Sequence, residues 1–150
     1  MDAIKKSFFD EVGGIPTIAK VHKIFYDKIY AHLWIGKFFQ GIDQKVIESQ
    51  QNDFMGQNFG GPVYYLGKLP VATHKHMLIT EELFELRKTL LLESLIEAKV
   101  SPEHIEKWLK VDGAFKNGIV KKSRDDCEKR YFTDSIQDFE NPYGSMSKAK

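Results

Sequence analysis

The residues best placed for chemistry are His74 and an amphipathic segment, residues 44–59, that precedes it along the chain. The apolar face of this segment carries glutamines and no histidine, and Gly60, Gly61 and Pro62 separate it from His74. One histidine facing a pocket that holds only weak ligands or hydrogen-bond donors is typical of a haem protein with one protein ligand and one open face. The pattern therefore predicts gas binding or oxygen chemistry, and not a closed electron carrier.

The amide side chains of residues 44–59 are unusual for an inward helix face. Ile47 and Phe54 mark the apolar direction of this helix, and Gln50, Gln51 and Asn58 fall within about 60° of it. An inward amide without a partner costs roughly 1–3 kcal/mol, so adjacent amides beside a cavity indicate a ligand to be bound. A structural amide that bonds a backbone carbonyl is the alternative interpretation.

Tyr26 is the second candidate for a group that points into a cavity. It lies in a helix predicted over residues 16–31, about 80° from the centre of that helix's apolar stripe. The stripe consists of Ile18, Val21, Phe25 and Ile29. From the edge of the stripe, the Tyr26 ring can be buried while its hydroxyl points into a cavity.

Length and composition restrict the class of protein. The chain has 150 residues, which predicts one domain, and its formal net charge of +1 does not favour nucleic acid or an anionic membrane as a partner. No apolar stretch approaches the roughly 18 residues that span a bilayer. The first six residues lack the apolar core of a signal peptide, so we expect a cytoplasmic protein.

The periodicity of the apolar residues predicts an all-α chain, without alternating strand patterns. Thr80 and Ser101 are expected N-caps, and Pro102 fits a first helical position. Residues 122–150 are mostly polar, and we expect mobility in about the last 15 of them. The expected helices cover residues 2–12, 16–31, 44–59, 81–98, a long stretch from 102 to about 119, and a short docked stretch at 131–139.

Zinc is the main alternative metal, but its ligand pattern is missing. A zinc site needs three or four ligands with recognisable spacing, whereas His74 and His76 with Glu81 or Glu82 are too few. On a helix His76 points about 200° away from His74, so the two cannot share one role. Like the other remaining histidines, His76 is expected on the surface or hydrogen-bonded in the core. Cys127, the single cysteine, lies in a charged run and is expected to be an ordinary surface thiol.

The joint spacing of several short motifs resembles that of the truncated haemoglobins, group I, over residues 6–121. The motifs are Gly13-Gly14, Phe25-Tyr26, Phe38-Phe39-x-Gly41-x-Asp43, Phe54, Gly60-Gly61-Pro62, Tyr65-x-Gly67, His74 and Phe84. The resemblance implies an all-α truncated globin, a two-over-two helical sandwich around haem b. It divides the chain into a globin domain, 1–121, and a polar C-terminal extension, 122–150, that is partly helical or disordered. One departure is the stretch 76–79, which lacks the family's usual glycine.

The resemblance also implies roles for polar residues. His74 matches the proximal iron ligand, and Tyr26 matches the distal tyrosine whose hydroxyl bonds dioxygen. Gln51 matches a glutamine that completes a Tyr–Gln pair in some members. Gln50 lies where certain members place a histidine or lysine that binds iron itself, and Ile47 lies at a distal position often held by glutamine or leucine.

Apolar residues complete the site that the resemblance implies. Phe39 matches the phenylalanine that packs on the haem face, and Phe54 matches a residue that lines the inner pocket. Phe25, Tyr65 and Phe84 belong to the same motif spacing that resembles the family's, and the resemblance implies that they contact the cofactor.

The sequence thus favours a haem-b protein that reversibly binds O₂, with NO and CO as related ligands. Hydrogen bonds from Tyr26 and Gln51 to a bound dioxygen predict slow O₂ release. The absence of histidine or lysine on the cavity-facing positions of residues 44–59 predicts no strong internal sixth ligand. One alternative is an enzyme, either an NO dioxygenase that depends on an external reductase or a peroxide-reducing haem protein. Another is a haem-free helical interaction module in which Gln50, Gln51 and His74 are only structural.

Overall fold

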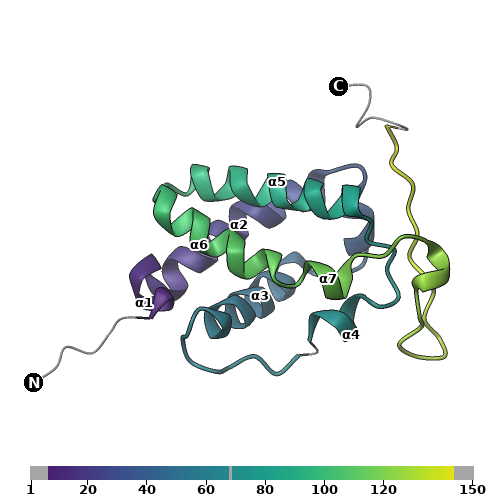
Figure 1. Ribbon diagram of the computed structural model, residues 1–150, viewed down its shortest axis with the longest axis horizontal. Helices are drawn as coiled ribbons and strands as arrows, with labels where there is room; N and C mark the ends of the chain where they lie inside the picture. The colour runs from purple at the N-terminus through teal and green to yellow at the C-terminus, as the bar shows by residue number, and fades with distance from the viewer. Residues whose placement is uncertain (1–6, 68, 144–150) are drawn as a thin grey trace, which may run out of the picture.

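The computed structural model describes residues 7–67 and 69–143, and helices dominate this part of the chain. The main helices are α2 (Gly14–Ala31), α3 (Gln44–Asn58), α5 (Glu81–Glu97) and α6 (Pro102–Gly113). Helix α2 packs against α3 and α5, and α5 packs against α6 (Figure 1). The described residues contain two isolated β-bridges and no strand, so the predicted all-α class is confirmed. None of the described helices is long and apolar enough to cross a membrane.

Short helices connect or extend the long ones. They are α1 (Phe8–Val12), the 3₁₀ helix η1 (Ile35–Phe39), α4 (Pro70–His74), α7 (Lys116–Ile119) and the 3₁₀ helix η2 (Arg124–Asp126). Of these, η1 and α4 lie outside the helix ranges that were expected from the sequence, and α4 ends at His74. Pro70 begins α4 at a position where its missing N–H costs no hydrogen bond.

Side-chain caps begin two of the long helices where the sequence predicted them. The Thr80 hydroxyl accepts a hydrogen bond from the backbone N–H of Leu83 at the start of α5. The Ser101 hydroxyl accepts one from the N–H of His104 at the start of α6. Each cap satisfies a backbone donor that has no partner within its helix.

Several predicted helix ends were wrong, and glycine explains most of the differences. Gly13 and Gly14 have φ angles of 109° and 68°, and this left-handed pair turns the chain so that α2 begins at Gly14 instead of Pro16. The long helix expected from 102 to 119 ends at Gly113 and is followed by the separate α7. The expected helix at 2–12 is present from Phe8, and residues 1–6 lie outside the described part.

The predicted helix at residues 131–139 is absent. The Gln137 N–H donates to the carbonyl of His76, and the Leu78 N–H donates to the carbonyl of Gln137, both at 2.8 Å. These bonds occupy backbone groups that a helix would need, so this segment runs extended beside the chain after α4. Phe139 packs on the ring of Phe38 with ring centroids 4.9 Å apart, as its apolar character predicted, but Phe132 is 96% exposed.

A buried polar pair joins α2 to α3. His22 is 2% exposed, and its Nδ1 donates to Oδ1 of Asn52 at 2.6 Å. The ring also lies edge-on to Trp108 of α6, which is fully buried. Burial lowers the pKa of His22 from 6.5 to about 4, so the ring is neutral at physiological pH. The expectation of a hydrogen-bonded core histidine is confirmed for His22.

Lowering the pH should therefore destabilise the fold through His22. Its pKa is 6.5 when unfolded and about 4 when folded, so the unfolded chain binds the extra proton between these values. The contribution is fully present above pH 6.5 and is lost as the pH falls towards 4. Urea unfolding measured at pH 7, 5.5 and 4.5 should show a steeper loss of stability in the native sequence than in His22→Gln, which cannot titrate. Parallel pH profiles for the two proteins would contradict this account.

Candidate functional site

One cavity of about 560 Å³ brings together every residue that the sequence analysis assigned to a site. A cavity of this size falls within the range of small-molecule and cofactor pockets. Helices α2, α3, α4 and α5 all contribute side chains to its wall. The predicted residues that line it are Phe25, Tyr26, Phe39, Ile47, Gln50, Gln51, Phe54, Tyr65, His74 and Phe84.

His74 has the geometry of a fixed, neutral imidazole. Its Nδ1 lies 2.7 Å from the carbonyl oxygen of Pro70, one turn earlier in α4. A carbonyl only accepts, so Nδ1 carries the proton and Nε2 keeps a lone pair. Burial lowers the pKa of His74 from 6.5 to about 4, which keeps the ring neutral. A neutral ring oriented by a backbone carbonyl is the usual form of a histidine metal ligand.

Tyr26 supplies a buried hydroxyl donor to the same cavity. The residue is 5% exposed, and its ring stands edge-on to Phe25 and Phe39, with centroids 4.9 and 6.0 Å apart. Burial raises the pKa of the Tyr26 phenol well above its usual value of 10. The hydroxyl therefore remains protonated and can donate a hydrogen bond to a group inside the cavity.

The amides of α3 divide between two roles. Gln50 and Gln51 both line the cavity; Gln51 is half-buried, whereas Gln50 is exposed to solvent. Asn58 does not line it, and its Nδ2 donates to the carbonyl of Phe54 at 2.7 Å. Asn58 is therefore a structural amide that bonds a backbone carbonyl, while Gln50 and Gln51 remain available to a ligand.

The remaining wall is rich in aromatic rings. The Phe54 ring packs against Tyr65 and Phe115, with centroid separations of 5.0 and 5.4 Å. Phe39 and Phe84 line the cavity from η1 and α5. Such walls match a flat, apolar molecule, because ring faces and edges contact it without losing hydrogen bonds.

These features fit the haem that the sequence predicted. His74 offers one imidazole Nε2 for iron, and the aromatic wall offers contact for a porphyrin. Among the described residues, no group of three or more His, Cys, Asp or Glu side chains is close enough to hold another metal ion. The donor set therefore agrees with haem and does not agree with a zinc site.

Sequence reasoning missed an ion pair in the cavity wall, in which the aspartate is buried and the arginine partly exposed. Nη1 of Arg87 in α5 lies 2.6 Å from Oδ2 of Asp112 in α6, and both residues line the cavity. The Arg87 guanidinium also lies over the rings of Phe25 and Phe84, 5.3 and 5.9 Å from their centroids. Helical spacing alone did not distinguish these two residues from exposed charges.

A second missed group lies where the C-terminal segment meets the chain after α4. His76, Arg130 and Gln137 also line the cavity. His76 is 3% exposed, and its Nδ1 has no hydrogen-bond partner among the described residues. The expectation of a surface or hydrogen-bonded His76 was therefore wrong. Cys127, in the C-terminal segment, is a free thiol, but it is half-buried and not fully on the surface as expected; burial raises the pKa of its thiol.

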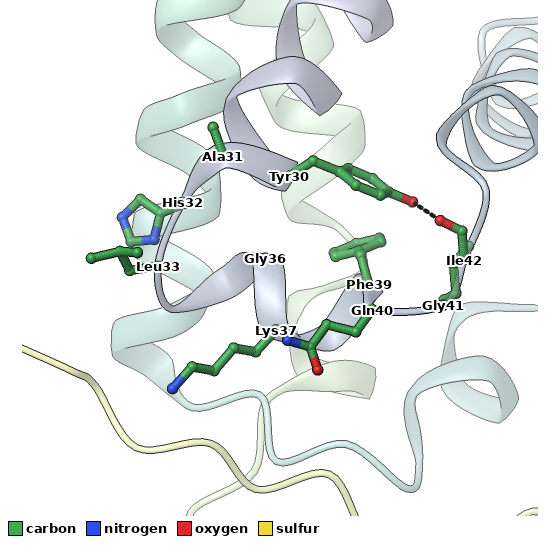
Figure 2. Close-up of a pocket in the computed structure, with 10 residues that line it drawn as sticks. All are labelled: Tyr30, Ala31, His32, Leu33, Gly36, Lys37, Phe39, Gln40, Gly41 and Ile42. Atoms are coloured by element: carbon green, nitrogen blue, oxygen red, sulfur yellow. Dashed lines mark hydrogen bonds between the residues drawn. The ribbon is translucent and has the colours of Figure 1, made fainter.

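A second hollow of about 430 Å³ lies at the turn between α2 and α3 (Figure 2). Its wall includes Tyr30, whose hydroxyl donates to the carbonyl of Ile42 at 2.9 Å. Phe39, Gln40 and Ile42 line both this hollow and the main cavity. The Tyr30 hydroxyl is therefore outside the main cavity, although it lies only one helical turn after Tyr26.

Known proteins with similar sequences carry the same fold and cofactor class. The family model of the bacterial-like globins matches residues 7–121. Group 1 truncated haemoglobins of Tetrahymena thermophila and Chlamydomonas moewusii are each 28% identical, and the matches cover 79% of this chain and 92% and 70% of those proteins, respectively.

Solved structures of truncated haemoglobins have a similar fold. The truncated haemoglobin of Tetrahymena pyriformis in its Fe(III) form has a TM-score of 0.72 and 26% identity, covering 78% of this chain and all of that one. A group II truncated haemoglobin of Bacillus anthracis shares the fold at a TM-score of 0.72 and 20% identity, covering 80% and 95% of the two chains. The predicted two-over-two architecture is confirmed.

Removing only one member of the Arg87–Asp112 pair should be costly. Arg87→Met would leave the carboxylate of Asp112 buried, at 6% exposure, without its cation, and should lower the free energy of unfolding by roughly 3–5 kcal/mol. The double variant Arg87→Met with Asp112→Leu should recover most of that loss. Urea unfolding of the three proteins tests this, and a double variant as unstable as the single one would refute it.

Proposed function

Because this chain belongs to the bacterial-like globin family and so binds haem and oxygen, we propose that it is a group I truncated haemoglobin with His74 as its iron ligand. The observation that carries the proposal is the hydrogen bond from Nδ1 of His74 to the carbonyl of Pro70. This bond leaves Nε2 unprotonated and holds the ring in the cavity wall. When bound, haem supplies the iron at which a diatomic gas binds.

The rest of the cavity supports an open ligand site. The side chains of α3 that line the cavity are Val46, Ile47, Gln50, Gln51, Phe54 and Met55. None of them is a histidine or lysine, so helix α3 offers no strong nitrogen ligand that would occupy the iron's open position. We therefore expect exchangeable binding of O₂, and of NO and CO, which are also small diatomic molecules.

Tyr26 and Gln51 favour retention of dioxygen over CO. The protonated Tyr26 hydroxyl and the Gln51 amide can both donate hydrogen bonds to an oxygen ligand that carries partial negative charge. Each charge-assisted bond contributes roughly 1.5–3 kcal/mol. CO accepts hydrogen bonds weakly, so these residues discriminate among ligands by polarity.

The absorption spectrum of the ferrous protein tests the proposed function directly. We expect a five-coordinate spectrum without added gas, a stable oxy form in air, and loss of the five-coordinate histidine-bound form in His74→Ala. A six-coordinate ferrous spectrum without gas would show that an internal ligand closes the site. Failure of the native chain to bind added haem would overturn the proposal altogether.

The role of Tyr26 is tested by the rate of O₂ release. Tyr26→Phe removes one hydroxyl donor and should speed O₂ release by about 10- to 100-fold, the equivalent of one charge-assisted hydrogen bond. Tyr30→Phe is the matched control, because its hydroxyl bonds the Ile42 carbonyl outside the main cavity. Stopped-flow displacement of O₂ by CO measures both. An unchanged rate in Tyr26→Phe would remove Tyr26 from the ligand site.

A further inference from the structure

The cavity extends beyond the part of the chain that matches the globin family. The family match ends at residue 121, yet Arg130 and Gln137 line the cavity. Figure 1 shows the chain after α7 running beside α4, at the end of the molecule away from α1. The residues that lie there, 122–139, are called the C-terminal wall below.

Backbone hydrogen bonds attach the C-terminal wall to the chain that follows α4. The Glu128 N–H donates to the carbonyl of Lys75 at 2.7 Å, next to His74. Gln137 exchanges two further backbone bonds with His76 and Leu78, both 2.8 Å long. The wall is therefore joined to the residues directly after His74 at two separate points.

The far end of the wall is anchored near η1. The indole Nε1 of Trp34 donates to the carbonyl of Phe139 at 2.7 Å, and the Phe139 ring packs edge-on against Phe38. Trp34 and Phe38 are both buried, and Phe38 itself lines the cavity. The wall thus bridges the two regions that flank one side of the cavity, one containing His74 and one containing Phe39.

The C-terminal wall also brings polar groups to the cavity, next to His76 of the chain after α4. Nε and Nη2 of Arg130 donate to the carboxylate of Asp134, at 3.0 and 3.2 Å, which leaves Nη1 for another acceptor. Nδ1 of His76 and Oε1 of Gln137 are buried without partners among the described residues. Such polar groups are costly in an apolar wall, so their presence points to a polar part of the ligand.

Haem has only one strongly polar feature, its two carboxylates, and these need a cation or water. Two arginines line the cavity. Each is paired with an aspartate, and their side chains are similarly exposed, 25% for Arg87 and 27% for Arg130. The difference is that Asp112 lines the cavity, where it would repel a haem carboxylate beside Arg87, whereas Asp134 does not line it. A carboxylate beside Arg130 would keep partial hydration while gaining a charge-assisted hydrogen bond. Arg130 therefore suits a haem carboxylate better than Arg87 does.

We propose that the C-terminal wall is part of the haem-binding site: Phe139 anchors it, and Arg130 binds a haem carboxylate. This inference rests on the proposed function, because the ligand is haem. It assigns a binding role to a segment outside the family match, and the wall should slow the dissociation of haem.

The anchor is tested by the rate of haem transfer from the full-length ferric protein to excess apomyoglobin. Phe139→Ala should release haem about tenfold faster, since it removes the ring that holds the wall on Phe38. Phe132→Ala is the matched control, because the Phe132 ring belongs to the same wall and is 96% exposed. Equal rates in the two variants would overturn the wall's role.

The carboxylate contact is tested with two forms of the cofactor, haem and its dimethyl ester. Arg130→Met combined with Asp134→Leu leaves no carboxylate unpaired, and it should release haem about tenfold faster while the rate for the ester is unchanged. Arg124→Met is the control: Arg124 lies in the same wall and faces Asp138 at 3.4 Å, but it does not line the cavity. Equal acceleration for haem and ester would refute the carboxylate contact.

Haem binding by the native chain and by the wall variants distinguishes the proposed function from the role of the C-terminal wall. If the native chain bound no haem, the proposed function would be wrong. If the native chain and all wall variants held haem equally well, only the role of the C-terminal wall would be wrong.

Discussion

The fold must keep a cavity of about 560 Å³ open inside a chain of 150 residues. Protein interiors are close-packed, so a void of this size sacrifices contacts that a collapsed core would make. The helices around it resist collapse because buried groups fix them to one another: His22 joins α2 to α3, and Arg87 joins α5 to α6. A ligand that fills the cavity recovers the missing contacts, so binding and stability are linked in this molecule.

Local patterns in the sequence were sufficient to predict several of the residues that line the cavity. Helical periodicity predicted that Tyr26 lies at the edge of the apolar stripe of α2 and that Gln51 lies on the inward face of α3. Both residues line the cavity. Phe39, Phe54, Tyr65 and Phe84 came instead from the spacing shared with a known family. Caps at Thr80 and Ser101 were predictable because a cap depends on residues only three positions apart.

Features that depend on distant residues were not predictable in this way. Arg87 and Asp112 are 25 positions apart, and periodicity does not tell which charge on one helix meets which charge on another. The apolar spacing of residues 131–139 fits a helix, but the backbone of Gln137 forms hydrogen bonds with the chain after α4, and the segment is extended instead. Asn58 shared its face with the two glutamines, yet a carbonyl of its own helix satisfied it.

The position of Arg130 and Gln137 in the cavity wall has a consequence for biosynthesis. Ribosomes extend the chain from the N-terminus, so His74 and the α3 side of the cavity emerge well before these two residues. Until residue 139 has left the exit tunnel, the cavity lacks one of its sides. A cofactor can therefore contact every side of the cavity only after the chain has been translated beyond the globin match, through residue 139.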